Sequence, residues 1–371
     1  MSVESSGQVL DVFTIVGARP QFIKAAAFSR AVQLENKNGC GAQIKETIIH
    51  TGQHFDDNMS KVFFEELDIP EPLYNLEISG LEHGEMTGKM LVGLSDILEF
   101  HKPDLVLVYG DTNSTLAASL AASRLEIPLA HVEAGLRSFN EFMPEEINRK
   151  IADRLSSLLF SPSLLAQENL YSEGMGEKAF FVGDIMFDTA LLFAEKASRS
   201  NFLANYNLVK DGYVLVTLHR AENSDDDLNL NNIFYALAEI SKTKRVILPA
   251  HPRVRQKIET FFASKSGASV TLVPPLSYID FTNALINSTA VLTDSGGVQK
   301  EAFFHSVPCI TMRNETEWLE TVECGANVLV GADKNTIISA WNNIARVCSP
   351  SNPYGDGNAG IKIVKAIKDY F

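Results

Sequence analysis

The sequence predicts an α/β protein built from two doubly wound parallel-sheet domains. Short apolar, β-branched runs alternate with amphipathic helical patterns along the whole chain, which is the rhythm of repeated βα units. Most of these runs end in Gly, Asp, His or Ser, residue types typical of a turn after a strand. The alternation relaxes between residues 186 and 210 and then begins again, so we expect a domain boundary near residue 186.

Each domain has its own series of strand-like runs. In residues 8–185 they are, in chain order, VFTIV, ETIIHTG, DLVLVYGD, LAHVEAG, LLFSPS and AFFVGD. In residues 186–359 they are YVLVTLHR, RVILPAHP, VTLVPPL, AVLTDSGG and PCITMR. A helical pattern over 360–371 is expected to pack back on the first domain. Because open parallel sheets bind ligands at the carboxyl ends of their strands, we expect the active site in the cleft between the two domains.

The composition argues against several kinds of partner. Hydrophobic residues make up 45% and charged residues 21% of the 371 residues, as in a soluble globular protein. With 46 acidic and 32 basic residues the net charge is −14, so we expect neither nucleic acid nor an anionic membrane as a partner. The segment MSVESSGQVL has no signal-peptide pattern, and no apolar run is as long as a membrane span. These features predict a cytoplasmic protein.

Two loops combine glycine with a helix start, the arrangement that binds anions. In GARPQFIKAA, Arg19 and Lys24 follow the first strand. In TDSGGVQKEA, Ser295, Gly296 and Gly297 follow a strand of the second domain, where backbone N–H groups can approach a diphosphate. The alternative for the first loop is that Arg19 pairs with a carboxylate and Lys24 is solvated.

Two histidines end strands of the second domain, His219 in TLHRAEN and His251 in PAHPRV. An arginine lies near each of them, so both loops can present hydrogen-bond donors to an anionic ligand. A single histidine at a strand end is more often a structural hydrogen-bonding residue than a catalyst. Two histidines at the same predicted edge of the sheet favour a functional role for both.

Carboxylates follow the strands of the first domain. Asp111 follows DLVLVYG, Glu133 follows LAHV, and Glu145 with Glu146 opens a helix after Pro144. Helix capping is the alternative for Asp111, and favourable interaction with the helix dipole is the alternative for the glutamates. Their spacing does not suggest a metal site, and three carboxylate loops at one cleft suit proton transfer. No G-x-S-x-G elbow, P-loop or G-x-G-x-x-G fingerprint is present, which weakens hydrolase, NTPase and dehydrogenase interpretations.

Taken together, these loops resemble the non-hydrolysing UDP-N-acetylglucosamine 2-epimerases over nearly the whole chain. The matching segments are, in order, GARP..IK, HTGQH, GDT.ST, HVEAGLRS, PEE.NR, LHRAEN, HP and DSGG.Q.E. The resemblance implies two Rossmann-like halves of the glycosyltransferase-B type, often in a homodimer. It also implies inversion of a UDP-sugar at C2 without a redox cofactor, through elimination of UDP to a 2-acetamidoglycal and re-addition.

The resemblance also implies roles for individual residues. Asp111, Glu133 and Glu145 become the acid/base candidates, and His219 with the Ser295-Gly296-Gly297 turn is expected to hold the diphosphate. The remaining substrate-binding candidates with a basic or imidazole side chain are Arg19, Lys24, His54, Arg137, Arg149 and His251. Glu301 is expected at the ribose hydroxyls, and Phe281 is expected against uracil. Arg137 and Arg149 are expected either to tether the carboxylates or to touch phosphate.

Two positions depart from the family pattern. Gln21 stands where a glutamate is common, and Lys300 stands where the family has QEE. With the stretch NETEWLETVECGANVLVG, the sequence looks most like the branch that epimerises UDP-2,3-diacetamido-2,3-dideoxy-glucuronate to its manno form for surface polysaccharide synthesis. A substrate with a C6 carboxylate favours both charge changes. The alternative is neutral drift on exposed helix turns.

Three other functions stay open at this point. The first is an ordinary UDP-N-acetylglucosamine 2-epimerase, which makes UDP-N-acetylmannosamine. The second is a glycosyltransferase with the same two-domain fold, which would need a separate acceptor. The third is a catalytically silent UDP-sugar-binding protein.

Overall fold

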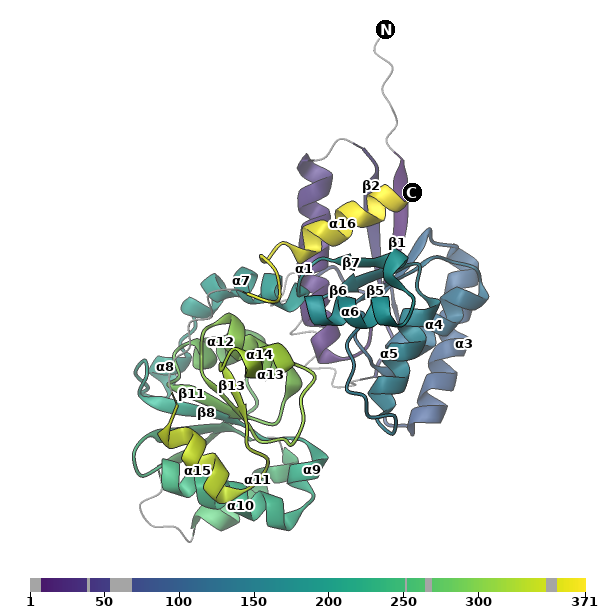
Figure 1. The fold of residues 1–371 in the computed structure, drawn as a ribbon. Helices are drawn as coiled ribbons and strands as arrows, with labels where there is room; N and C mark the ends of the chain where they lie inside the picture. The colour runs from purple at the N-terminus through teal and green to yellow at the C-terminus, as the bar shows by residue number, and fades with distance from the viewer. Residues whose placement is uncertain (1–7, 39–40, 54–68, 251, 264–268, 345–351) are drawn as a thin grey trace. The chain divides into compact units, whose positions relative to one another are not determined.

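The computed structural model describes residues 8–38, 41–53, 69–250, 252–263, 269–344 and 352–371. The chain divides into two compact units, each with its own parallel sheet (Figure 1). The first unit comprises Met1–Thr189 together with Asn352–Phe371, and the second comprises Ala190–Ser351.

The sheet of the first unit has the strand order β3-β2-β1-β4-β5-β6-β7, and its strands pair in parallel. The strands are β1 (Val9–Val16), β2 (Gln43–His50), β3 (Tyr74–Asn75), β4 (Leu105–Tyr109), β5 (Leu129–Val132), β6 (Leu158–Ser161) and β7 (Ala179–Phe181). Strand order reverses between β1 and β4, which is where doubly wound sheets bind their ligands.

Helices cover both faces of this sheet. They are α1 (Arg19–Asn38), α3 (His83–His101), α4 (Asn113–Arg124), α5 (Pro144–Leu155), α6 (Leu164–Ser172), η1 (Gly176–Lys178) and α16 (Ala359–Tyr370). Helix α7 (Ile185–Ser198) begins in this unit and ends in the second. On one face, α3 buries Met86, Met90, Leu94 and Leu98, a four-residue repeat that packs with α4 onto the strands. The C-terminal helix α16 returns to this unit and lies along α1 (Figure 1).

The sheet of the second unit has the order β10-β9-β8-β11-β12-β13, also parallel. Its strands are β8 (Tyr213–Thr217), β9 (Arg245–Pro249), β10 (Val270–Val273), β11 (Ala290–Thr293), β12 (Cys309–Thr311) and β13 (Asn327–Leu329). The helices are α8 (Phe202–Asn205), α9 (Ala221–Ser224), α10 (Asp227–Ile240), α11 (Pro252–Ala263), α12 (Tyr278–Ile286), α13 (Gly296–Phe304), α14 (Leu319–Glu323) and α15 (Lys334–Asn342). Two apolar clusters, one with α10 and one with α12, form its core.

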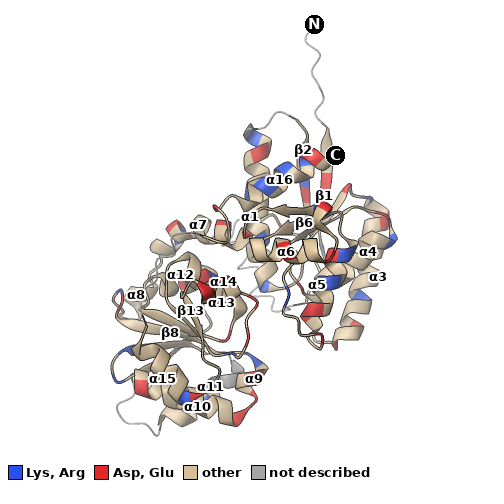
Figure 2. Ribbon diagram, viewed as in Figure 1, with Lys and Arg blue, Asp and Glu red and all other residues tan. Residues whose placement is uncertain are grey.

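These observations confirm the predicted fold class of two doubly wound parallel sheets. The quoted strand-like runs correspond to β1, β2 and β4–β12. The sequence analysis missed β3 and β13, which lie at sheet edges and have two and three residues. Figure 2 shows acidic and basic residues interspersed on the helices of both units. In the described residues, none of the helices combines the length and apolar character needed to cross a membrane.

Candidate functional site

Three strand ends meet closely at Gly17, the residue after β1. A Cβ added at Gly17 would lie 2.1 Å from Thr51 Oγ1 and 2.2 Å from Ser114 Oγ. These two hydroxyls are themselves hydrogen-bonded at 2.8 Å. Glycine at the start of GARP therefore lets the loops after β1, β2 and β4 approach one another.

Gln21 joins the β1–α1 turn to the β4–α4 turn. Its Oε1 accepts hydrogen bonds from the N–H groups of Gly17 (2.8 Å) and Ala18 (3.0 Å). Its Nε2 donates to the carbonyl of Tyr109 (2.9 Å) and to Thr112 Oγ1 (3.0 Å). Gln21 is only 1% exposed, so the idea of drift on an exposed turn is wrong for this residue. An ionised glutamate could accept from the first loop but could not donate to the second.

Lys24 and Glu133 form a buried ion pair at the carboxyl edge of the sheet. Lys24 lies in the second turn of α1, and Glu133 directly follows β5. The Nζ atom of Lys24 donates to Glu133 Oε2, and each residue is 7% exposed. A Cβ at the neighbouring Gly110 would lie 3.2 Å from that oxygen and 3.3 Å from Nζ. The alternative of a solvated Lys24 is therefore wrong.

Asp111 is held by Arg149 of α5. Arg149 donates to Asp111 Oδ2 from Nε (2.9 Å) and from the second terminal nitrogen (2.6 Å). The other terminal nitrogen of Arg149 lies 2.9 Å from Oε2 of Glu146, which also accepts from Ser138 N and Oγ. Burial alone would raise the pKa of Glu146, but the hydrogen bonds from Ser138 and the charge of Arg149 lower it. The Asp111–Arg149–Glu146 chain thus fixes Asp111 against α5.

The two glutamates at the start of α5 differ in environment. Glu145, the acid/base candidate, is partly exposed in the first turn, whereas Glu146 is fully buried and linked to Arg149. The sequence placed Glu146 at this helix start but did not predict its link to Arg149, because its burial depends on the loop that carries Ser138. Arg19 is the first residue of α1 and is partly exposed at the same edge of the sheet.

Arg137 tethers two carboxylates, Glu173 and Asp153, and neither of them is one of the acid/base candidates. Its guanidinium binds both oxygens of Glu173, at 2.7 and 2.8 Å, and Asp153 Oδ2 at 2.8 Å. It also donates to the carbonyl of Leu136, and the side chain is fully buried. Each of these contacts lies inside the first unit.

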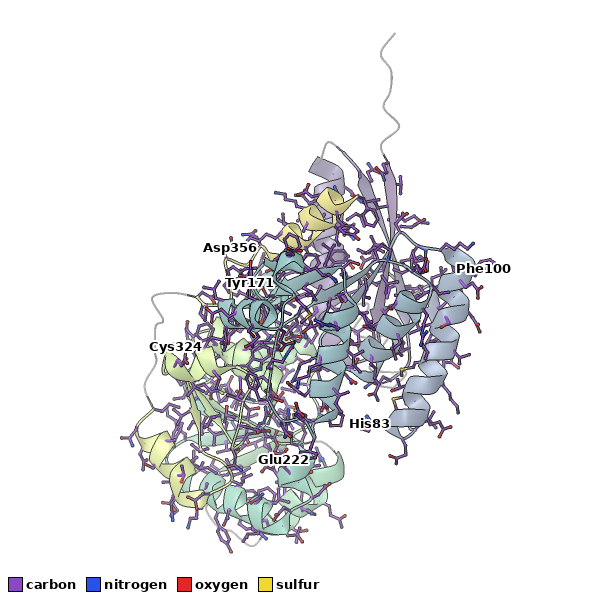
Figure 3. The ribbon with its side chains drawn as sticks, turned by 45° about the vertical axis from the view of Figure 1, so that its right-hand side comes forward. His83, Phe100, Tyr171, Glu222, Cys324 and Asp356 are labelled. Atoms are coloured by element: carbon purple, nitrogen blue, oxygen red, sulfur yellow. The ribbon has the colours of Figure 1, made fainter. Side chains whose placement is uncertain are left out.

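Figure 3 labels His83 at the start of α3, which the sequence analysis did not single out. Its Nδ1 lies 3.1 Å from Nδ2 and 3.3 Å from Oδ1 of Asn113, the first residue of α4. His83 is therefore exposed, and it contacts Asn113, which lies two residues after Asp111 in the sequence. No local pattern marks it, because the contact joins two separate helix starts.

In the second unit, His219 follows β8 and contacts Asp294, which follows β11. The His219 Nδ1 lies 3.2 Å from Asp294 Oδ1, and the backbone N–H groups of His219 and Arg220 donate to the same carboxylate. Burial alone would raise the pKa of Asp294, but the hydrogen bonds and charge of His219 lower it. Asp294 is buried, whereas the His219 side chain is 53% exposed and can reach a ligand. The sequence analysis passed over Asp294.

The start of α13 is open at Gly297 but not at Gly296. Ser295 is the N-cap, and a Cβ at Gly297 would meet nothing within 4 Å. A Cβ at Gly296 would lie 3.5 Å from Trp318 Nε1. The Nζ of Lys300 lies 3.8 Å from the centre of a Trp318 ring, and Lys300 is 2% exposed, so drift on an exposed turn is wrong here too.

The remaining candidates fall in different surroundings. Phe281 of α12 is buried in an apolar cluster of the second unit. Glu301 of α13 is also buried. His54 and His251 lie outside the described residues. Figure 3 also labels Glu222, an exposed residue of the short helix α9 that follows His219.

Each unit therefore offers one kind of chemistry. The first unit presents two carboxylates that are each held by a cation, Glu133 by Lys24 and Asp111 by Arg149. Carboxylates held in place in this way are suited to proton transfer. The second unit presents an exposed imidazole and a helix start that is open at Gly297, which suit an anionic group.

A sequence model of the protein family described as UDP-N-acetylglucosamine 2-epimerase matches residues 38–368. A UDP-2,3-diacetamido-2,3-dideoxy-D-glucuronate 2-epimerase of Pseudomonas aeruginosa is 49% identical over 362 residues, covering 96% of this chain and 99% of its own. A UDP-N-acetylglucosamine 2-epimerase of Methanocaldococcus jannaschii is 44% identical over 363 residues, covering 95% and 97%.

Solved structures show the same similarity. The UDP-GlcNAc 2-epimerase of Methanocaldococcus jannaschii, in complex with UDP-GlcNAc and UDP, aligns with a TM-score of 0.87 and 44% identity over 98% of this chain and 100% of that one. The UDP-GlcNAc 2-epimerase of Neisseria meningitidis, bound to UDP-GlcNAc, also has a TM-score of 0.87, at 32% identity over 97% and 100%.

Proposed function

Because the chain belongs to the UDP-N-acetylglucosamine 2-epimerase family and is an isomerase of UDP-sugars, we propose that it converts UDP-2,3-diacetamido-2,3-dideoxy-glucuronate to its manno epimer. The observation that carries the reaction type is the pair of cation-held carboxylates, Lys24–Glu133 and Arg149–Asp111, beside the β1–β4 reversal of strand order. The 49% identity to an enzyme named for this substrate favours the diacetamido-uronate.

The reaction has two halves that balance without a redox cofactor. A carboxylate takes the C2 proton while the C1–O bond to UDP breaks, which leaves a 2-acetamidoglycal and UDP. An acid on the opposite face then returns a proton to C2, and a phosphate oxygen of UDP forms the bond to C1 again. The hydrogen at C2 is poorly acidic, so the enzyme must both supply the base and stabilise departing UDP.

The residues divide between these tasks. We assign proton transfer to Asp111, Glu133 and Glu145, with Arg149 holding Asp111 in place. Lys24 and Arg19 lie at the start of α1 and supply positive charge for the phosphates.

The second unit supplies UDP binding in this proposal. His219 and the Ser295-Gly296-Gly297 turn bind the diphosphate, Glu301 accepts from the ribose, and the edge of Phe281 contacts uracil. His54 and His251 remain proposed substrate contacts. We also propose a cytoplasmic homodimer that serves surface polysaccharide synthesis.

UDP-N-acetylglucosamine is the second candidate substrate. A relative at 46% identity is named a UDP-N-acetylglucosamine 2-epimerase homolog, and one at 44% identity is named a UDP-N-acetylglucosamine 2-epimerase. Gln21 and Lys300 do not decide between the substrates, since both side chains are used in internal packing. The choice therefore needs a direct measurement.

The test is proton NMR in D₂O with each UDP-sugar offered separately. We expect conversion, with deuterium entering C2, for the diacetamido-uronate. Conversion of UDP-N-acetylglucosamine alone would show that this sugar, the second candidate, is the substrate. Absence of exchange with both sugars would contradict the epimerase proposal, and product formed only after an acceptor is added would indicate a glycosyltransferase.

A further inference from the structure

A buried network centred on His131 lies behind the carboxylates of the first unit. His131 is the third residue of β5 and is fully buried. Its Nδ1 lies 2.7 Å from Asp153 Oδ1 of α5, and its Nε2 lies 2.8 Å from the carbonyl oxygen of Gly110. The mechanism proposed above uses neither His131 nor Asp153.

Both ring nitrogens of His131 face hydrogen-bond acceptors. The Gly110 carbonyl can only accept. Asp153 already receives the N–H of Gly135 (3.1 Å) and the guanidinium of Arg137 (2.8 Å) on its other oxygen. A guanidinium and a backbone N–H on one carboxylate oxygen are the partners expected of an ionised acceptor. Two acceptors require two ring N–H groups, which makes the ring an imidazolium.

The charges around the ring balance this assignment. From α5 the ring faces Asp153, and from the loop after β5 it faces Arg137 across that carboxylate. Arg137 is in turn paired with Glu173, at the end of α6. With His131 protonated, two cations and two carboxylates form one connected group, in which Asp153 is buried and Glu173 is exposed.

Gly110, the residue that His131 holds, lies between two of the acid/base candidates, Asp111 and Glu133. Gly110 has φ +59°, and its N–H donates to the Val132 carbonyl at 3.0 Å. Asp111 is the next residue along the chain. The Lys24–Glu133 pair lies so close to Gly110 that an added Cβ would be 3.2 Å from the Glu133 carboxylate. Glu133 itself has φ +75°, a conformation that a glutamate keeps only when its surroundings impose it.

We propose that His131 is a positioning residue, protonated on both ring nitrogens, that holds Gly110 and thereby sets the spacing of Asp111 and Glu133 for proton transfer at C2. The inference rests on the proposed function, because that function makes those two carboxylates the reacting groups.

The first test is ¹⁵N NMR of the histidine rings in the intact enzyme at pH 7.5, a value chosen about one unit above the ordinary histidine pKa of about 6.5. We expect His131 to give the signature of an imidazolium. In Asp153→Asn, the uncharged amide still accepts from Gly135 and Arg137, and we expect the ring signature to become neutral. A neutral ring in the wild-type protein would overturn the proposal.

The second test is kinetic and uses His131→Gln. A glutamine can donate to Gly110, but its oxygen would then face the Asp153 carboxylate. We expect kcat to fall by about 10- to 100-fold while UDP affinity, measured by calorimetry, changes less than about threefold. We also expect the pH–kcat profile to change, because the spacing of the two proton-transfer groups changes.

The matched control is His101→Gln in the same unit, where the imidazole contacts Tyr74 at 2.9 Å and lies at the far end of α3. If His131→Gln does not fold, Asp153→Asn carries the same kinetic test. A variant with lower thermal stability but normal kcat and an unchanged pH profile would show a merely structural role and overturn the inference. A wild-type enzyme that turns over no UDP-sugar would instead contradict the proposed function, while the ring signature could still be measured.

Discussion

At the scale of single residues, two of the three acid/base candidates, Glu133 and Asp111, differ in how cleanly they can be tested. Glu133 is buried against Lys24, so its removal would leave an unpaired buried ammonium and endanger the fold. The Asp111 side chain is 31% exposed, and Arg149 keeps Glu146 as a second partner. Asp111 is therefore the better position at which to separate chemistry from stability.

Replacing Asp111 by Asn keeps the size of the side chain and removes its basicity. We expect turnover to fall by roughly two or more powers of ten, the scale of a lost acid/base group, while UDP affinity stays nearly unchanged. Steady-state NMR assays and calorimetry with UDP measure the two effects. Asp96→Asn, at an exposed position of α3, is the control and should match the wild type. Near-normal turnover of Asp111→Asn would remove this residue from the mechanism.

Glu46, a carboxyl of the first unit that takes no part in the proposed mechanism, affects the stability of the fold. Glu46 of β2 accepts from Thr14 Oγ1 at 2.7 Å, and burial raises its pKa to about 7 from 4.5. The folded protein holds this proton more tightly than the unfolded chain does. The contribution of protonated Glu46 to the free energy of unfolding is therefore fully present below pH 4.5 and is lost as pH rises through 7.

Glu46→Gln should therefore match the wild type near pH 5 and be more stable at pH 8, by about 1–3 kcal/mol in the free energy of unfolding. Denaturant unfolding at several pH values measures this difference. The control is Glu99→Gln, at an exposed position of α3, which should follow the wild type at each pH. A Glu46→Gln variant that is less stable at pH 8 would show that the carboxylate is favourably bound instead.

Sequence reasoning at this scale found the groups that face a strand end and missed those that support them. Glu133 directly follows β5, and Asp111 and His219 lie two residues after β4 and β8, so strand periodicity alone predicts their edge of the sheet. Glu146 and Asp294 were missed or given a generic role, because their partners come from segments far apart in the chain or from another loop. A local pattern holds no information about such tertiary contacts.

At the scale of elements, α5 acts as a support for the carboxyl edge of the first sheet. Glu146, Arg149 and Asp153 are spaced three and four residues apart, so they share one face of the helix. Arg149 reaches Asp111, and Asp153 reaches His131. One helix thereby connects both acid/base loops, and Pro144 at its first position fixes where it begins.

The helix α13 gives a test of the diphosphate site that does not depend on catalysis. A methyl group at Gly297 would meet no protein atom within 4 Å, so Gly297→Ala should leave the fold intact and raise helix propensity by up to about 1 kcal/mol. If the diphosphate binds against this helix start, the methyl group occupies its space, and UDP affinity should fall by about tenfold or more.

Calorimetry with UDP and thermal unfolding measure these two quantities. Gly88→Ala in α3 is the matched control, since a Cβ there also meets nothing within 4 Å and the position is proposed to touch no ligand. It should affect stability alone. Equal UDP affinity for Gly297→Ala and the wild type would place the diphosphate away from α13.

Element prediction succeeded wherever a strand was long enough to show its pattern. The β-branched runs of β1, β4 and β8 are five to eight residues long and mostly buried, and each ends at a glycine, aspartate or histidine turn. The edge strands β3 and β13 are too short for periodicity to separate them from loop. Their pairing is decided by the neighbouring strands, which the local sequence does not encode.

At the scale of the whole molecule, the chain leaves the first unit once and returns to it at its end. Asp188 of α7 lies just before the exit and accepts the N–H groups of Ala359 and Gly360, the first residues of α16. The outgoing and returning segments of the chain are thus joined at one carboxylate. Gly360 permits close packing, since a Cβ there would lie 3.0 Å from the Ala31 Cβ of α1.

This arrangement predicts that the C-terminal helix stabilises the first unit and not the second. Ile363 of α16 is fully buried in that unit, so Ile363→Ala should cost about 2–5 kcal/mol there. Hydrogen exchange followed by mass spectrometry should show faster exchange in α1 and β1, with β8 and β11 unchanged. Lys365→Ala, at an exposed position of the same helix, is the control and should change neither unit. Equally faster exchange in both units would instead mean that they unfold together, and that the core of each depends on the other.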